Sequence, residues 1–149
     1  MIPFFVPEFT KEMEDAAINA LKNETSVRGE SVAKFEEEFA RYIGTKHAIS
    51  VNSGDAALHL SLIALNIEKN SKVLTSTNSF ISSANCILMT GAKPILCDIN
   101  YDDGNIDVKS TSEKPDAIIP VHIYGNPCDF ESIKNLSETY KIPIIEDAC

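Results

Sequence analysis

The hydrophobic and polar positions of this chain follow two alternating patterns along most of its length. Apolar residues that recur every three or four positions indicate amphipathic helices, whereas short continuous apolar runs indicate strands that are buried on both faces. The helical pattern predicts helices at residues 10–23, 31–43, 56–65, 80–90 and 130–140. The apolar runs predict strands at residues 47–51, 72–75, 94–98, 117–122 and 142–146. This alternation is typical of an α/β fold in which helices cover both faces of a mostly parallel central sheet.

Local signals support the ends of several of these elements. Ser31 is expected to cap the second helix and Gly44 to end it, and Asp129 stands where it would cap the last helix. Residues 100–115 form the one long predicted loop, and no internal repeat or linker interrupts the chain. We therefore expect residues 1–149 to form a helical N-terminal arm and the front part of one three-layer α/β domain.

The last predicted strand ends in an acidic pair, Glu146 and Asp147. In open α/β sheets ligands bind just outside the carboxyl ends of the strands, so a carboxylate there is a candidate functional group. Side chains alternate between the faces of a strand, so the two carboxylates are expected to point apart. The alternative role for Asp147 is a helix cap. A buried parallel strand needs both faces covered, so we also expect this chain to be the front part of a longer protein.

A second candidate site is the turn Ser53-Gly54-Asp55, which joins a predicted strand to an apolar helix. The amides and dipole of a helix N-terminus form an anion site, and Gly54 permits close approach of a phosphate. The alternative is an ordinary turn in which Ser53 or Asp55 is the N-cap. Phe80, at the start of a later helix, is either a core residue or an aromatic that stacks on a planar ligand. His122, at the end of a strand, is weighed in the same way, with packing as its main expected role.

Composition excludes some classes of function. A formal net charge of −9 argues against a nucleic-acid partner, because phosphate neutralisation requires a basic surface. The four cysteines show neither a Cys-x-x-Cys pair nor metal-ligand spacing, which favours structural thiols in a reducing compartment. No apolar run reaches the length of a membrane span, and two prolines interrupt the N-terminal segment, so no signal peptide is predicted. We expect a cytoplasmic protein.

Five segments, in order along the whole chain, resemble the N-terminal part of the DegT/DnrJ/EryC1/StrS sugar aminotransferases. That family has the aspartate-aminotransferase fold and uses pyridoxal 5′-phosphate (PLP). The matching segments are residues 35–40 with Gly44, 51–60, 83–85 with 91–94, 120–125 and 145–148.

The resemblance implies a role for each candidate residue. Gly54 and Asp55 would supply backbone amides to the cofactor phosphate, with the Ser53 hydroxyl beside them. Phe80 would stack on the pyridine ring, and Asp147 would pair with the protonated ring nitrogen. The family usually has Thr or Ser where this chain has Asp55. The Asp55 side chain is therefore expected to turn away as a cap, or the phosphate to be held differently.

The resemblance also implies a reaction. The expected enzyme transfers an amino group, usually from glutamate, to a nucleotide-linked keto sugar in polysaccharide or unusual-sugar biosynthesis, and it works as a homodimer. The lysine that forms the family's internal aldimine lies beyond the acidic strand, and no lysine of this chain stands in that context. We therefore expect the 149-residue chain itself to be inactive, with no catalytic residue of its own. The alternatives are a sugar dehydratase of the same fold, in which histidine replaces the lysine, a regulatory protein that binds without turnover, and a nucleotide-binding domain unrelated to PLP.

Overall fold

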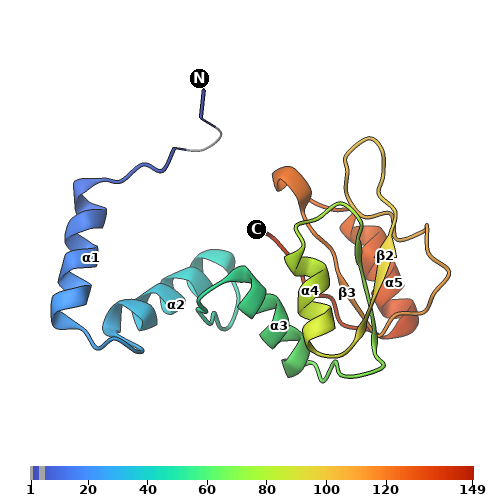
Figure 1. Cartoon of the computed structure of the whole chain (residues 1–149), viewed down its shortest axis with the longest axis horizontal. Coiled ribbons are helices and arrows are strands. Elements are labelled where there is room, and N and C mark those ends of the chain that lie inside the picture. Colours follow the sequence, from blue (N-terminus) through green and yellow to red (C-terminus); the bar gives the residue numbers. More distant parts are fainter. Residues whose placement is uncertain (1, 4–5) are drawn as a thin grey trace. The chain divides into compact units, whose positions relative to one another are not determined.

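The computed structural model describes residues 2–3 and 6–149 and divides the chain into two compact units, residues 1–50 and 51–149. Figure 1 shows helices α1 and α2 in the first unit and the sheet with its helices in the second. The helices are α1 Lys11–Asn23, α2 Glu30–Ile43, α3 Gly54–Ala64, α4 Ser82–Met89 and α5 Phe130–Tyr140. The strands are β1 Lys72–Ser76, β2 Lys93–Cys97 and β3 Ala117–Ile119, and a 3-10 turn spans Ile123–Gly125.

In the first unit, the start of α2 differs from the sequence prediction. The cap residue is Gly29, and Ser31 lies inside the helix. The carboxylate of Glu24 accepts hydrogen bonds from both the amide and the hydroxyl of Ser31, so a glutamate from the preceding loop replaces the predicted serine cap. The predicted end is confirmed, because Gly44 adopts the left-handed conformation with φ of 82°.

The predicted strand at residues 47–51 is wrong: none of these described residues is part of a strand. A strand requires a neighbour that accepts its amide hydrogen bonds. The amide of Ser50 donates instead to the carboxylate of Glu36 on α2, 2.8 Å away. Ile49 is 82% exposed, so an apolar residue in this segment is not buried within its own unit.

The second unit contains a parallel sheet with the strand order β2-β1-β3. The central strand β1 pairs with both neighbours, and Leu74 lies opposite Ile95 on β2 and Ile118 on β3. Two apolar clusters cover the opposite faces. Helices α3 and α4 pack on one face, where the buried residues are Leu58, Leu62, Ile67, Val73, Cys86, Ile87, Ala92, Ala117 and Ile119. Helix α5 packs on the other, where they are Leu74, Ile95, Cys97, Ile106, Val108, Ile118, Cys128, Ile133 and Ile142. The predicted three-layer α/β architecture is therefore confirmed.

The predicted strand at residues 142–146 forms only isolated parallel bridges beside β3. The amide of Ile118 donates to the carbonyl of Pro143, and the amide of Asp147 donates to the carbonyl of Pro120. A regular parallel ladder would have one more hydrogen bond between these two, donated by the amide of residue 120. Residue 120 is a proline, which has no amide hydrogen. Pro120 thus breaks the ladder, ends β3 earlier than predicted, and leaves residues 142–147 as an extended segment rather than a regular strand.

The remaining elements agree with the sequence to within a few residues. The helix predicted from Phe80 begins at Ser82, which leaves Phe80 in the preceding turn. Helix α5 has the predicted bounds, and Asp129 caps it by accepting a hydrogen bond from the amide of Ser132 at 3.1 Å. Within the described ranges, no helix combines the length and the apolar content needed to cross a membrane.

Candidate functional site

The candidate site is centred on Asp147, at the carboxyl end of the extended segment beside β3. Its side chain is buried, with the residue 8% exposed. Oδ2 accepts a hydrogen bond from the hydroxyl of Ser83 at 2.9 Å, and Oδ1 accepts a long one from the amide of Cys149 at 3.4 Å. In the part of the chain that the structure describes, Asp147 forms no salt bridge. A buried carboxylate usually has a cationic partner, so Asp147 retains the capacity to bind one.

The N-terminus of α3 lies beside this carboxylate. A Cβ added to Gly54, the first residue of α3, would lie 3.4 Å from the sulfur of Cys149, whose amide donates to Asp147. Ser53 caps the helix, since its side-chain oxygen accepts a hydrogen bond from the amide of Ala56 at 3.2 Å. The first amides of any helix have no partner within the helix. The site therefore combines the first amides of a helix with a nearby carboxylate.

The sequence left open whether Ser53 or Asp55 caps α3, and the structure decides between them. Ser53 is the N-cap, and its hydroxyl proton is still available because the oxygen acts as the acceptor. Asp55 is exposed in the first turn of α3, where a negative charge interacts favourably with the helix dipole. Asp55 is therefore not the cap, and its side chain makes no hydrogen bond within the described residues.

Phe80 lies in the turn between β1 and α4 and is 76% exposed. It is therefore not a core residue, and its ring is available to a ligand. The preceding residue, Ser79, places its hydroxyl oxygen 2.6 Å from that of Ser83, the residue that binds Asp147. A chain of short contacts thus leads from the turn that carries Phe80 to the buried carboxylate.

Glu146 and His122 form a separate pair. The amide of Cys128 donates to Nδ1 of His122, so the proton of the neutral ring is on Nε2, 3.0 Å from the carboxylate of Glu146. Glu146 therefore pairs with His122, which follows β3. The side chain of Asp147 binds Ser83 on α4 instead. The two carboxylates point apart as predicted, and His122 does not join the group around Asp147.

The cysteines are not activated thiols. Burial raises the pKa of Cys86 to about 11, with the charges of Asp147 and Asp55 as lesser causes. The pKa of Cys149 is raised mainly by the negative charge of Asp147. Burial also raises the pKa of the thiols of Cys97 and Cys128. Because a nucleophilic cysteine requires a lowered pKa, none of the four is suited to that role.

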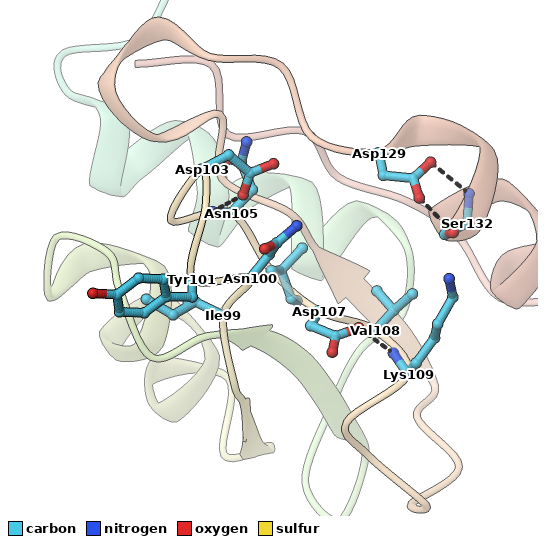
Figure 2. Close-up of a pocket in the computed structure, with 11 residues that line it drawn as sticks. Ile99, Asn100, Tyr101, Asp103, Asn105, Asp107, Val108, Lys109, Asp129 and Ser132 are labelled. Atoms are coloured by element: carbon cyan, nitrogen blue, oxygen red, sulfur yellow. Dashed lines mark hydrogen bonds between the residues drawn. The ribbon is translucent and has the colours of Figure 1, made fainter.

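A cavity of about 430 Å³ lies elsewhere in the second unit, between the loop after β2 and the start of α5 (Figure 2). Its three carboxylates stabilise local turns, since each accepts a hydrogen bond from a nearby amide. The acceptors are Asp103, Asp107 and Asp129, and the donors are Asn105, Lys109 and Ser132. The cavity shares no residue with the group around Asp147, and its acidic groups are already used by the backbone.

Sequence reasoning identified Ser53, Gly54, Asp55, Phe80 and Asp147 but assigned no role to Ser83. The structure brings Gly54 and Asp147 together through Cys149, and it links Phe80 to Asp147 through the two serines. The sequence does not single out Ser83, because Ser82 and Asn85 are further polar residues of the same helix.

Comparison with known proteins gives a consistent result. The model of the DegT/DnrJ/EryC1/StrS aminotransferase family matches residues 7–149. The spore coat polysaccharide biosynthesis protein SpsC of Bacillus subtilis is 37% identical over 99% of this chain, and 39% of its own length is covered. The UDP-4-amino-4-deoxy-L-arabinose–oxoglutarate aminotransferase of Shewanella sediminis is 34% identical, with the same coverage of both proteins. The chain thus spans about two-fifths of the length of these relatives.

Solved structures show the same similarity. DesV of S. venezuelae, in complex with a ketimine intermediate, has a TM-score of 0.86 and 33% identity over 92% of this chain and 38% of its own. NtdA of Bacillus subtilis, with bound pyridoxamine 5′-phosphate, has a TM-score of 0.83 and 30% identity over 95% of this chain and 34% of its own. A GDP-4-keto-6-deoxymannose-3-dehydratase with a trapped PLP–glutamate geminal diamine has a TM-score of 0.89 and 25% identity, covering 99% and 41%. PLP or its amine form is therefore the cofactor found in structures of this type.

Proposed function

Because this chain belongs to the DegT/DnrJ/EryC1/StrS aminotransferase family, we propose that it forms the front, cofactor-binding part of a PLP-dependent sugar aminotransferase. The activity is proposed for a protein of the relatives' length that contains this chain. The amino donor is glutamate and the acceptor is a nucleotide-linked keto sugar. The names of SpsC and of the Shewanella sediminis aminotransferase support a role in polysaccharide or unusual-sugar biosynthesis.

The observation that carries this proposal is the buried carboxylate of Asp147, which forms no salt bridge within the described residues. A protonated pyridine nitrogen is a cationic donor of the kind that this carboxylate lacks within the described residues. Asp147 already accepts a hydrogen bond from Ser83 on one oxygen, and the long contact from Cys149 leaves the other oxygen weakly engaged. The residues present therefore fit the cofactor ring, and Asp147 would hold its nitrogen in the protonated state.

The start of α3 fits the other end of the cofactor. The amides of Gly54 and Asp55 and the hydroxyl of Ser53 would bind the phosphate, since helix N-termini favour anions. The exposed Asp55 side chain carries a charge of the wrong sign for direct contact, so we assign only its amide to the phosphate. Phe80 would stack on the ring. The bound cofactor supplies an electron sink for the carbanion that forms when the donor amino acid loses its α-proton.

The proposal is tested by cofactor binding followed by a half-reaction. PLP is titrated into a protein of the relatives' length that contains this chain, and binding is measured from the absorbance of the cofactor. Addition of glutamate should then convert bound PLP to the amine form and release one 2-oxoglutarate per site. Absence of PLP binding would refute the proposal.

Substitution of the acidic pair tests the role of Asp147. The Asp147→Ala variant should slow the half-reaction more than it weakens phosphate binding, because the phosphate contacts lie on α3. The matched control is Glu146→Ala, since Glu146 is the adjacent carboxylate and pairs with His122 instead. A normal half-reaction rate in Asp147→Ala would show that the assignment of this residue is wrong.

The second candidate function is a sugar dehydratase of the same fold, favoured by the likeness to the dehydratase structure described above. Both enzymes would use the same PLP site. The two candidates are distinguished by incubating the loaded protein with glutamate and a nucleotide-linked keto sugar. An aminotransferase yields an amino sugar, whereas a dehydratase yields a deoxy sugar without net amination of the sugar. A regulatory protein would bind the cofactor and yield neither product.

We also propose that the protein is a cytoplasmic homodimer in which each active site is completed by the partner subunit. The first unit supports this proposal, because α2 exposes the apolar residues Val32, Phe35, Phe39 and Ile43. Size-exclusion chromatography with light scattering would test it, and a monomer at micromolar concentration would contradict it.

A further inference from the structure

Ser83 holds Asp147 by a hydrogen bond that neither the sequence patterns nor the assigned cofactor contacts include. Ser83 is the second residue of α4 and is 1% exposed. Its hydroxyl donates to Oδ2 of Asp147 at 2.9 Å, across 64 positions of sequence. The bond therefore joins the helix after β1 to the end of the extended segment beside β3.

The direction of this hydrogen-bond chain follows from the chemistry of its members. An ionised carboxylate only accepts hydrogen bonds, so the Ser83 proton must point toward Asp147. Because the one Ser83 proton is used, the 2.6 Å contact is a hydrogen bond when the Ser79 hydroxyl donates to Ser83 rather than to the carbonyl of Phe80, which lies 3.0 Å away. The order is thus Ser79 to Ser83 to Asp147, and each bond polarises the next.

An aspartate needs such a partner if its orientation is to be fixed. The terminal torsion of an aspartate side chain has a broad, roughly two-fold energy profile, so the carboxylate rotates easily. The Cys149 amide restrains the other oxygen only weakly, at 3.4 Å. Binding sites hold their reacting groups to within about 0.5 Å. The Ser83 bond is therefore the main restraint on carboxylate rotation among the described residues.

We propose that Ser83 is a positioning residue that orients Asp147 toward the ring nitrogen of the cofactor, with Ser79 as the support for Ser83. This inference rests on the proposed function, because it presumes that Asp147 binds that nitrogen. Ser83 itself does not touch the cofactor. Its contribution acts only through the carboxylate.

The test uses apo-protein of the relatives' length that contains this chain, titrated with PLP. Loss of one hydrogen bond to a charged group should raise the Kd for PLP about tenfold in Ser83→Ala. Ser83→Thr retains the hydroxyl and should restore the Kd to within about threefold of the unsubstituted protein. Ser79→Ala removes the supporting bond together with the contact between the Ser79 hydroxyl and the Phe80 carbonyl, and should raise the Kd about two- to threefold.

The matched control is Ser82→Ala. Ser82 is the neighbouring residue on α4 and is 8% exposed, yet its hydroxyl makes no hydrogen bond within the residues described. The same substitution at this position should leave the Kd within about twofold of the unsubstituted protein, which is the usual scatter for an independent site. Urea denaturation of each apo-variant confirms that it is folded.

A double-mutant cycle separates positioning from a general effect on α4. If Ser83 acts through the carboxylate, Ser83→Ala should change the Kd by less than about twofold in an Asp147→Ala background. An equal weakening in both backgrounds would overturn the positioning role.

The remaining outcomes distinguish this inference from the proposed function. If the unsubstituted protein binds PLP and Ser83→Ala behaves like Ser82→Ala, the positioning role is wrong and the proposed function stands. If the unsubstituted protein does not bind PLP, the proposed function fails and this inference fails with it.

Discussion

Replacement of Asp147 by asparagine should have different effects on the apo-protein and on the cofactor complex. Asparagine has nearly the same shape as aspartate, and its carbonyl oxygen can still accept the 2.9 Å hydrogen bond from Ser83. The substitution removes the negative charge and replaces the other oxygen, which accepts the weak 3.4 Å bond from the Cys149 amide, with an NH2 group. In the apo-protein this charge is buried without a cationic partner among the described residues, so its loss removes a desolvation cost.

The magnitudes follow from these contacts. A hydrogen bond to a charged group is worth about 1.5–3 kcal/mol, so loss of the charge should raise the Kd for PLP about 10- to 150-fold. The free energy of unfolding of apo Asp147→Asn should stay within about 1 kcal/mol of the unsubstituted protein, because the Ser83 bond persists. Asp147→Ala leaves the buried Ser83 hydroxyl without its acceptor and should lower that free energy by about 1–3 kcal/mol.

Two measurements on the same samples test this reasoning. Urea denaturation of the apo-proteins gives the free energies of unfolding, and absorbance titration with PLP gives the dissociation constants. We expect Asp147→Asn to be nearly as stable as the unsubstituted protein and to bind PLP far more weakly. Unchanged PLP affinity in Asp147→Asn would refute the charge argument. A loss of stability as large as that of Asp147→Ala would refute the claim that the Ser83 bond persists.

Three further predictions concern the caps and the thiol. Ser53→Ala should lower the free energy of unfolding, as measured by urea denaturation, by about 1 kcal/mol. Ser53→Thr keeps the capping hydroxyl and should retain most of that stabilisation. Hydrogen bonds from Ser132 lower the pKa of Asp129, so its stabilising effect is present above its unfolded-state pKa and is lost as the pH falls through the folded pKa. The stability difference between the unsubstituted protein and Asp129→Ala should therefore shrink on acidification below about pH 4, and a constant difference would contradict this prediction. In the 149-residue chain, the Asp147 charge raises the pKa of Cys149, so Asp147→Asn should speed alkylation of Cys149 at pH 8, as followed by mass spectrometry.

Much of the fold was readable from the sequence, because the helices and buried strands leave distinct hydrophobic patterns. Helix α5 appears with the predicted bounds, and its cap Asp129 was identified from position alone. The errors have specific causes. Residues 47–51 have the composition of a strand, but no neighbouring strand pairs with them in the described chain. Residues 142–146 lie beside β3 as expected, but Pro120 lacks the amide that would complete the ladder.

The candidate site shows the same division between local and tertiary information. Gly54 and Asp147 were identified because a helix N-terminus and the carboxyl end of a strand favour ligands wherever they occur. The sequence could not show whether Phe80 was buried, because that depends on which elements cover it. It also could not assign Ser53 and Asp55 their separate roles, since both are good cap residues and only one is at the cap position.

The sequence by itself determined the fold class, the family and the positions of the residues that we assign to the cofactor, because each leaves a local pattern. Only the tertiary structure decided how Asp147 is held. The Ser83 hydroxyl reaches it from another element, 64 positions away, and no periodicity or motif encodes a contact across that separation. Folding brings α4 against the segment beside β3, and that packing buries the Asp147 carboxylate and orients it.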